Sequence, residues 1–326
     1  MIKNKEDLRI IFMGTPEFAV ESLKELVENK YNVVGVITMP DKPAGRGYKL
    51  QQSPVKEYAE KRGLKILQPK NLKDEEFLNE LKELNADLQI VVAFRMLPEV
   101  VWSMPPMGTF NLHASLLPQY RGAAPINWAI INGEKETGIT TFFLKHEIDT
   151  GEIIFQEKLA VNEDDNAESM HDKLMIKGAK LVVKTVDAII ENNFSTIPQN
   201  QLYKNSTELK SAPKIFKDDC RIDWNKKSNE LFDFIRGLSP YPAAWTELIR
   251  YDTNECIRVK IFNSEKIEGN NDTQVGSILT DNKSFIDVAV NDGFLKVTDL
   301  QLSGKKRMKA VDFLNGYGFD KNDYFK

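Results

Sequence analysis

The feature that most constrains the fold of this chain is the alternation of short apolar runs with amphipathic stretches in its first part. Residues 9–13 and 33–38 are short and apolar, as buried strands are, and residues 18–28 between them repeat apolar side chains at helical spacing. Strand, helix and strand in this order are typical of a βαβ unit. The pattern continues with predicted helices over 54–62, 74–84 and 167–191 and predicted strands over 88–93, 108–112 and 138–144. We therefore predict a Rossmann-like, doubly wound α/β domain over residues 1–193, with parallel strands buried on both faces.

The second part of the chain has a different pattern. Residues 194–213 lose the periodicity and are rich in Asn, Gln, Ser, Thr and Pro, which is the composition of a connector, so we predict a linker there. Beyond the linker, one helix is predicted over 228–238. Short strands are predicted after it, over 245–249, 257–262, 276–279, 286–290 and 295–302. Many short strands with turn residues between them predict a small β-barrel domain over residues 214–326.

Length, charge and cysteine content limit the possible functions. A chain of 326 residues exceeds what one ordinary core supports, in agreement with two domains. The formal net charge of -4 argues against a generally basic nucleic-acid binder, so contact with a nucleic acid would require local basic patches. The two cysteines, Cys220 and Cys256, are far apart and lack ligand spacing, so we expect neither a disulfide framework nor a metal site.

Several cofactors and locations are also not expected from the sequence. The turn after the first predicted strand, Met13-Gly14-Thr15-Pro16, lacks the GxGxxG pattern, so no NAD is expected despite the Rossmann-like rhythm. A Walker A sequence is absent, which argues against ATP use. No apolar run approaches the length of a membrane span and the N-terminus lacks a signal-peptide core, so we expect a cytoplasmic protein without a membrane partner.

The most informative segment for chemistry is Asn111-Leu112-His113-Ala114-Ser115-Leu116-Leu117-Pro118, where a predicted strand ends and a loop begins. Side chains alternate along a strand, so Asn111 and His113 should share one face while Leu112 packs on the other. A second polar turn, Asp149-Thr150-Gly151, follows the next predicted strand, and open α/β sheets bind ligands at such strand ends. Taken singly, each segment has an ordinary alternative, because a histidine near a strand end is often structural and Asp-Thr-Gly is a common turn.

Together, these two segments resemble the signature of the folate-dependent formyltransferases, which pairs Asn-x-His-x-Ser-Leu-Leu-Pro with a downstream Asp-x-Gly turn. Further segments are similar to the branch of that family that formylates methionyl-initiator tRNA: Gly14-Thr15-Pro16, Pro40-Asp41-Lys42-Pro43-Ala44-Gly45-Arg46-Gly47, Ser53-Pro54-Val55-Lys56, Arg121-Gly122-Ala123-Ala124-Pro125, Arg221-Ile222-Asp223-Trp224, Pro240-Tyr241-Pro242 and Gly304-Lys305-Lys306. The resemblance covers nearly the whole chain. It implies a formyltransferase domain followed by an OB-like barrel, and an enzyme that transfers the formyl group of 10-formyltetrahydrofolate to the amino group of methionyl-initiator tRNA.

The resemblance implies that Asn111, His113 and Asp149 form the catalytic group, and formyl transfer independently requires those residue types. An amide such as that of Asn111 can stabilise the negative charge that builds on the formyl oxygen. A histidine can take a proton from the attacking amine and return one to the departing folate nitrogen. A carboxylate beside that histidine would orient the ring and favour its charged form.

Folate contacts are implied for two segments. They comprise Ser115, Leu116, Leu117 and Pro118, and also Phe94, Arg95, Met96 and Leu97. In the second segment the family usually has Ala-Tyr/Phe-Gly-x-x-Leu-Pro, whereas this chain has Ala93-Phe94-Arg95-Met96-Leu97-Pro98, which is one residue shorter and lacks the glycine. We expect this loop to form the lip of the folate pocket, with Arg95 restricting the backbone where a glycine would be permissive.

Two basic clusters are candidates for contact with tRNA. The first lies in a Gly/Pro-containing segment without helical or strand pattern, where we expect an exposed loop, and comprises Lys42, Arg46 and Lys49. The resemblance implies that this loop enters the acceptor end of the tRNA, with Arg46 contacting phosphate or base edges. The second cluster lies in the predicted barrel and comprises Lys305, Lys306, Arg307 and Lys309, of which the first three are the candidate contacts. We expect a phosphate-binding face there, and solvated surface charge is the ordinary alternative for both clusters.

Two other functions remain open from the sequence. A folate-dependent formyltransferase acting on a small amine, such as glycinamide ribonucleotide or an amino sugar nucleotide, would share the catalytic group. A non-catalytic RNA-binding relative could keep the fold alone. A small substrate needs neither the basic loop nor the basic barrel, and the intact catalytic group argues against a degenerate relative. We expect a monomer.

Overall fold

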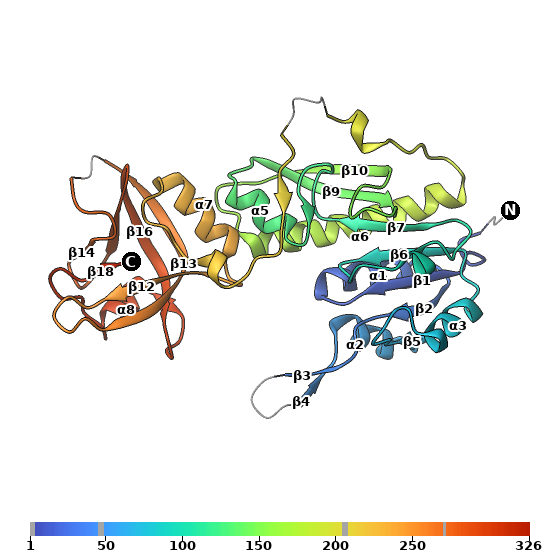
Figure 1. The fold of residues 1–326 in the computed structure, drawn as a ribbon, viewed down its shortest axis with the longest axis horizontal. Coiled ribbons are helices and arrows are strands. Elements are labelled where there is room, and N and C mark those ends of the chain that lie inside the picture. The colour runs from blue at the N-terminus through green and yellow to red at the C-terminus, as the bar shows by residue number, and fades with distance from the viewer. Residues whose placement is uncertain (1–3, 45–48, 204–207, 270–271) are drawn as a thin grey trace. The chain divides into compact units, whose positions relative to one another are not determined.

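The computed structural model of the chain describes residues 4–44, 49–203, 208–269 and 272–326 (Figure 1). The chain divides into two compact units built from interleaved segments. The first comprises Met1–Gly122, Glu136–Ala160 and His171–Ser211, and the second comprises Ala123–Lys135, Val161–Met170 and Ala212–Lys326. Most of the predicted linker over 194–213 therefore belongs to the first unit, and the domain boundaries at 193 and 214 stay a prediction.

A seven-stranded sheet with helices on both faces forms the first unit. Its elements are β1 (Ile10–Gly14), α1 (Glu17–Glu28), β2 (Val33–Ile37), β3 (Lys42–Ala44), β4 (Lys49–Gln51), α2 (Pro54–Lys61), β5 (Ile66–Leu67), α3 (Glu75–Glu83), β6 (Leu88–Val92), α4 (Glu99–Trp102), β7 (Thr109–His113), β8 (Arg121–Gly122), β9 (Glu136–Phe143), β10 (Ile153–Ala160), most of α6 (Ala167–Ile190) and the 3-10 turn η1 (Gln199–Gln201). The strand order is β10-β9-β7-β6-β1-β2-β5. Because the chain starts in the middle of the sheet, extends to β5 on one side and returns to β6 on the other, the predicted doubly wound topology is confirmed.

The direction predicted for residues 138–144 is wrong. Strands from β5 to β7 pair in parallel, but β9 runs antiparallel to β7, and β10 runs antiparallel to β9. Residues of β9 are buried along nearly the whole strand, as in the parallel strands, so its composition does not reveal its direction. The result is an antiparallel edge on an otherwise parallel sheet.

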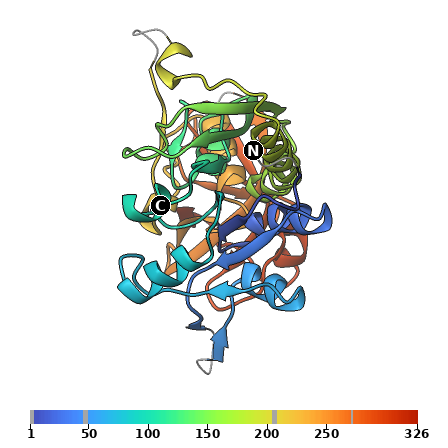
Figure 2. The same cartoon turned by 90° about the vertical axis from the view of Figure 1, so that its right-hand side faces the viewer.

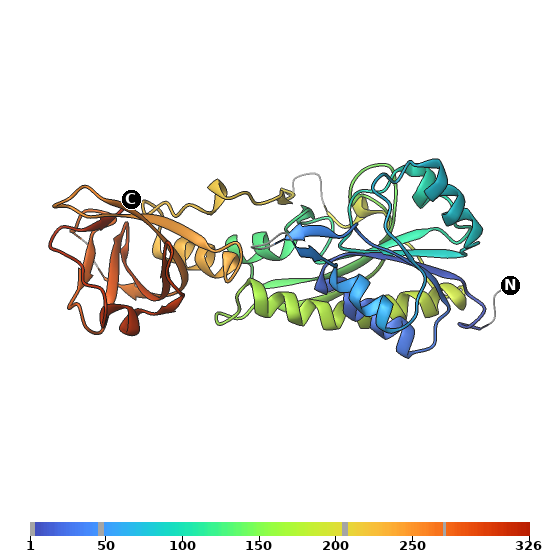
Figure 3. The same cartoon turned by 90° about the horizontal axis from the view of Figure 1, so that it is seen from below.

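Alternation along the strands assigns the two faces of this sheet. On one face, Met13 joins a buried cluster with Phe77 and Leu81 of α3. On the other, Leu112 packs so closely against α6 that a Cβ at Gly178 would come 2.7 Å from its Cδ2 atom. Figure 3 shows α1 and α6 along one side of the sheet and α3 on the opposite side. The prediction that Leu112 faces away from its two polar neighbours is therefore confirmed.

The segment predicted as a loop contains two paired strands, Lys42–Ala44 and Lys49–Gln51, which we call the β3–β4 hairpin. Strands β3 and β4 pair antiparallel, with Lys42 opposite Gln51, and the hairpin projects beyond the seven-stranded sheet in Figures 1 and 2. Each strand has three residues, and the first includes Pro43, so the pairing leaves no periodic apolar pattern in the sequence. Arg46, the predicted tRNA contact, lies outside the described residues.

An antiparallel barrel forms most of the second unit. Its elements, with α5 and the strand at the division between the units, are α5 (Pro125–Ile131), β11 (Ser211–Ala212), the 3-10 turn η2 (Asp218–Cys220), α7 (Ser228–Leu238), β12 (Ala244–Ile249), β13 (Cys256–Glu268), β14 (Ile278–Thr280), β15 (Ile286–Val290), β16 (Gly293–Leu302), β17 (Met308–Lys309), α8 (Ala310–Leu314) and β18 (Tyr324–Phe325). Six strands follow the order β14-β15-β16-β13-β12-β18, and a bridge between Ser277 and Tyr324 links the two ends. The sheet thus curls into a nearly closed barrel, as predicted. No helix within the described residues is long and apolar enough to span a membrane.

Candidate active site

His113 is the last residue of β7, at the carboxyl end of the parallel strands. Its side chain is buried, with 7% of its surface exposed, and its Nε2 atom lies 2.9 Å from the carbonyl oxygen of Tyr120. A carbonyl oxygen can only accept a hydrogen bond, so we assign the proton to Nε2. The other nitrogen, Nδ1, faces the carboxylate of Asp149, whose Oδ2 atom is 3.9 Å away. The ring therefore presents its proton-accepting nitrogen to an acidic side chain.

Asp149 lies on the turn between β9 and β10 and has the unusual φ of +55°. Its Oδ2 atom accepts a hydrogen bond of 3.0 Å from the backbone N–H of Gly122. Gly151 allows the turn to lie against the end of β9, since a Cβ there would come within 1.6 Å of the carbonyl oxygen of Phe143. A left-handed non-glycine residue persists only when its surroundings impose it, and such residues gather at functional sites.

Asn111 completes the predicted group. It pairs with Val91 of β6 and Phe142 of β9, two residues before His113 on the same strand face, and it is half-buried. The structure thus brings together an imidazole and a carboxylate and places an amide on the same face beside the imidazole. Among the described residues, no group of three or more His, Cys, Asp or Glu side chains could hold a metal ion.

The predicted folate contacts of the Leu-Leu-Pro segment are packed into the protein. Ser115 donates to the carbonyl oxygen of Gln119 at 2.7 Å, and its own carbonyl accepts from Thr140 Oγ1 at 2.6 Å. Leu117 donates through its N–H to the same Oγ1 and accepts through its carbonyl from Gln156. The side chains of Ser115, Leu117 and Pro118 are buried, and that of Leu116 is half-buried. Their contact with folate stays a prediction, and this packing makes the segment a firm support for the end of β7.

Arg95 holds the shortened lip loop against a neighbouring segment. Its guanidinium donates to the carbonyl oxygens of Pro69 and Lys70, and burial lowers its pKa. Left-handed backbone occurs at Ala93 rather than at Arg95, so the missing glycine causes no strain at the arginine itself. Within the loop, Met96 is exposed, Leu97 is buried and Phe94 is half-buried.

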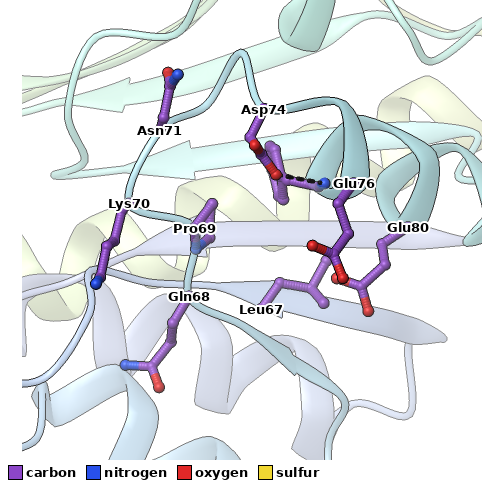
Figure 4. Close-up of a pocket in the computed structure, with 9 residues that line it drawn as sticks. Leu67, Gln68, Pro69, Lys70, Asn71, Asp74, Glu76 and Glu80 are labelled. Carbon is purple, nitrogen blue, oxygen red and sulfur yellow. Dashed lines mark hydrogen bonds between the residues drawn. The ribbon is translucent and has the colours of Figure 1, made fainter.

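A cavity of about 390 Å³ lies between this neighbouring segment and α3 (Figure 4). Pro69 and Lys70, the residues that Arg95 holds, line it on one side, and Glu76 and Glu80 line it on the other. None of the predicted folate contacts is among its lining residues. Arg95 therefore connects the lip loop to the wall of a separate cavity.

Arg307 differs from the lysines of the two basic clusters because its charge is paired within the protein. Lys42 is exposed at the start of β3, and Lys49 begins β4. Lys305 and Lys306 are exposed in the turn after β16. Arg307, in contrast, forms two hydrogen bonds with the buried carboxylate of Asp299, at 3.0 Å from Nε and 2.7 Å from Nη2. Its charge is therefore already compensated within the barrel.

Sequence reasoning missed the residues that hold the predicted catalytic group in place. Gly122, which contacts Asp149, lies in the Arg-Gly-Ala-Ala-Pro segment that only the resemblance marked, and Tyr120, which contacts His113, directly precedes that segment and was not singled out. Gln199 contacts the Asp149 turn from the predicted linker, where its polar composition gave no signal. Most of these contacts join segments that are distant in sequence. The spacing of apolar residues along the chain does not reveal such contacts.

Comparison with known proteins identifies the family. The protein-family model described as Formyl transferase matches residues 8–186. A second family model, described as Formyl transferase, C-terminal domain, matches residues 214–318. A methionyl-tRNA formyltransferase of Parabacteroides distasonis is 64% identical over 314 residues, covering 96% of this chain and 97% of the relative. The chain belongs to the methionyl-tRNA formyltransferase family. Another member of this family, from Porphyromonas gingivalis, is 52% identical over 324 residues, or 99% of each chain.

Solved structures agree on the fold. The sugar 3N-formyl transferase WlaRD, crystallised in the presence of dTDP and 5-N-formyl-THF, is similar with a TM-score of 0.60 at 21% identity, covering 92% of this chain and 99% of that chain. HypX from Aquifex aeolicus, in complex with tetrahydrofolic acid, has a TM-score of 0.61 at 18% identity, covering 98% of this chain and 50% of that chain. The predicted architecture of the methionyl-tRNA formyltransferase family, an α/β domain followed by a barrel, is thereby confirmed for this chain.

Proposed function

We propose that this chain transfers the formyl group of 10-formyltetrahydrofolate to the free amino group of methionyl-initiator tRNA, giving N-formylmethionyl-tRNA for translation initiation. Membership of the methionyl-tRNA formyltransferase family supports the reaction. The single structural observation that carries the proposal is the placement of His113 Nδ1 3.9 Å from Asp149 Oδ2. A proton-accepting nitrogen that faces a carboxylate at the end of a parallel strand is suited to acid–base chemistry.

The residues at the site fit the formyl donor, which supplies the one-carbon group when bound. Asn111 offers an amide N–H to the formyl oxygen, where negative charge develops as the amine attacks, and such a donor lowers the barrier by about 3 kcal/mol. His113 takes the proton of the amine at Nδ1, because Nε2 donates to the carbonyl oxygen of Tyr120. It returns that proton to the folate nitrogen as the bond between this nitrogen and the formyl carbon breaks. Asp149 stabilises the positive charge that this transfer places on the ring. At 3.9 Å the two side chains are too far apart for a direct hydrogen bond but close enough for strong electrostatic attraction.

We also propose that the β3–β4 hairpin and the exposed lysines of the barrel contact the tRNA. Asp41, directly before β3, receives hydrogen bonds from Lys56 Nζ at 2.6 Å and Gln68 Nε2 at 2.8 Å. These bonds hold the pKa of Asp41 below its ordinary value. The two hydrogen bonds hold Asp41 in place at the base of the hairpin, directly before Lys42. Phosphate contacts of this kind position a nucleic acid without reading its sequence.

Two further parts of the proposal concern the state of the protein. We propose that the chain acts as a monomer in the cytoplasm, where initiator tRNA and reduced folates are found. Gel filtration with light scattering, at the enzyme concentrations used for activity, checks the proposed monomeric state. A dimeric mass there would contradict it.

Formylation assays with three acceptors test the function. Methionyl-tRNA, glycinamide ribonucleotide and an amino sugar nucleotide are each incubated with the enzyme and 10-formyltetrahydrofolate, and formyl transfer is measured. We expect transfer to methionyl-tRNA alone. Transfer to a small amine with higher kcat/KM would favour the alternative of a small-molecule formyltransferase, and no transfer to any acceptor would favour a non-catalytic RNA-binding relative.

Variants of the catalytic group test the assigned roles. We expect His113→Ala and Asp149→Ala to lower kcat severely while leaving affinity for tRNA near the wild-type value, because neither side chain belongs to the proposed tRNA surface. Filter binding with methionyl-tRNA provides the comparison. Wild-type turnover in either variant would show that the roles are wrongly assigned.

A further inference from the structure

Gln199 lies on η1 and its side chain is buried, with only 3% of the residue exposed. The Nε2 group donates two hydrogen bonds, to the carbonyl oxygen of Asp149 at 2.8 Å and to that of Gly151 at 2.9 Å. These two carbonyls flank the turn that carries the Asp149 carboxylate. One side-chain amide thus holds both ends of the turn.

Arg121 fixes the other side of the same amide. Its Nε and Nη2 groups donate to Gln199 Oε1, at 3.0 and 2.6 Å. All four hydrogen-bonding positions of the Gln199 amide are therefore filled. The orientation of the amide is also determined, because guanidinium groups only donate and carbonyl oxygens only accept.

Three consecutive residues therefore attach to the catalytic group. Tyr120 accepts from the ring of His113, Arg121 orients Gln199, and Gly122 donates to the carboxylate of Asp149. The backbone around Gln199 is itself anchored, since Ile197 exchanges two backbone hydrogen bonds of 2.9 Å with Ile153 at the start of β10. A single connected set of bonds thus links the histidine, the carboxylate and the chain segment that leaves the first unit.

We propose that Gln199 and Arg121 are positioning residues for formyl transfer, which hold the Asp149 turn so that its carboxylate stays beside His113 Nδ1. The inference rests on the proposed function, because it assigns Gln199 a role only through Asp149. Such support stabilises the turn because Asp149 has a φ of +55°, in the left-handed region that most non-glycine residues disfavour. Misplacement of a catalytic group by about 1 Å costs about 100-fold in rate.

The substitution Gln199→Glu separates positioning from general structural support. A glutamate has the same shape and forms a charged pair with Arg121, so the link between those two residues is kept. It loses both donors and places an oxygen against the carbonyls of Asp149 and Gly151. If the bonds to the turn matter, we expect kcat to fall about 100-fold with KM for both substrates within about threefold. A role in stability alone predicts an unchanged kcat.

A double-mutant cycle ties the effect to Asp149. Gln199→Glu is combined with Asp149→Asn, which keeps the shape of the side chain and removes its charge, and kcat is measured for both single variants and the double variant. We expect the double variant to be no slower than Asp149→Asn alone, because the positioned charge is already absent. Gln89→Leu provides the matched control. Gln89 is also a buried amide, 1% exposed, and it pairs with Thr109 at the opposite end of the sheet, so this variant should lose thermal stability and keep its kcat.

The outcomes distinguish the inference from the function on which it rests. A slow Asp149→Asn variant together with wild-type kcat in Gln199→Glu would overturn the inference and leave the proposed function standing. Additive losses in the double variant would also overturn it, since Gln199 would then act independently of Asp149. Wild-type kcat in Asp149→Asn would overturn both. If Gln199→Glu fails to fold, Arg121→Met replaces it in the same cycle, with an expected loss of about tenfold because the amide keeps its donors but loses its anchor.

Discussion

Lys306 and Arg307 are neighbours in sequence, yet the structure predicts opposite consequences for losing each of them. The side chain of Lys306 is exposed, and no ion pair of it occurs in the described part of the chain. Arg307 is bound to Asp299 by two hydrogen bonds, and its guanidinium carbon lies 4.3 Å from the ring centroid of Phe262. Lys306→Gln and Arg307→Gln each remove one formal charge. We expect the first to weaken binding of tRNA and the second to weaken the barrel.

The expected magnitudes follow from burial. Asp299 has 6% of its side chain exposed, and without Arg307 its one remaining ion-pair partner among the described residues is Lys309, whose Nζ is 3.5 Å away. Breaking a fully buried ion pair costs about 3–5 kcal/mol, but the side chain of Arg307 is 44% exposed and one cation remains, so we expect a loss of about 2 kcal/mol. Loss of Lys306 should change the free energy of unfolding by less than about 0.5 kcal/mol.

Two measurements on the same preparations check this prediction. Affinity for methionyl-tRNA is measured across a range of salt concentrations, where each lost phosphate contact lowers the slope of log Kd against log salt by about 0.7–0.9. Lys306→Gln should lower the slope by this amount with an unchanged Tm, and Arg307→Gln should lower the Tm by several degrees with nearly the same slope. A reduced slope and an unchanged Tm in Arg307→Gln would refute the reasoning, because Arg307 would then contact phosphate rather than stabilise Asp299.

Three other substitutions have defined expectations. Gly151→Ala should lower kcat about 100-fold, because the new Cβ would lie 1.6 Å from the carbonyl oxygen of Phe143 and must displace the Asp149 turn. Gly316→Ala, which has open space around the new Cβ, should be neutral in the same kinetic assay. Asp41→Asn should raise KM for methionyl-tRNA and leave KM for the folate unchanged, as measured by steady-state kinetics, since it removes the ion pair at the base of the hairpin; an equal rise in both would contradict that role. Arg95→Ala should raise KM for 10-formyltetrahydrofolate several-fold because the lip loop loses its attachment, and an unchanged KM would mean that the loop does not contact the folate.

Elements with strong local signals were predictable from the sequence. Helix α7 occupies the predicted residues, because its apolar positions recur at helical spacing over a length that favours a helix. Ser53 caps α2 because its Oγ atom accepts a hydrogen bond of 3.1 Å from the N–H of Lys56, which fixes where that helix begins. The face shared by Asn111 and His113 follows from strand alternation alone. In each case the determinant lies within a few residues of the element.

Features that depend on distant partners were not predictable in the same way. The antiparallel direction of β9 depends on where the chain returns to the sheet, and the burial of β9 on both faces conceals it. β10 pairs along the edge of the sheet with alternating exposure in its second half, and α5 is short, so neither gave a clear periodic signal. The engagement of Arg307 with Asp299 was equally hidden, since a basic cluster in sequence does not reveal which of its charges are compensated.

Gln199 shows most directly why the composition of a segment does not establish its role. A polar stretch between two domains is typical of a connector, and that composition is compatible with Gln199 as a solvated residue. Its amide is instead buried, because the carbonyls of the Asp149 turn and the guanidinium of Arg121 together offer a partner to every one of its polar atoms. A buried polar group is tolerated only with such partners, so the burial of Gln199 is itself a consequence of the Asp149 turn that it contacts. The chain segment that leaves the first unit is therefore part of the structure that holds the carboxylate, and changes in this segment should affect the rate of transfer as well as the connection between domains.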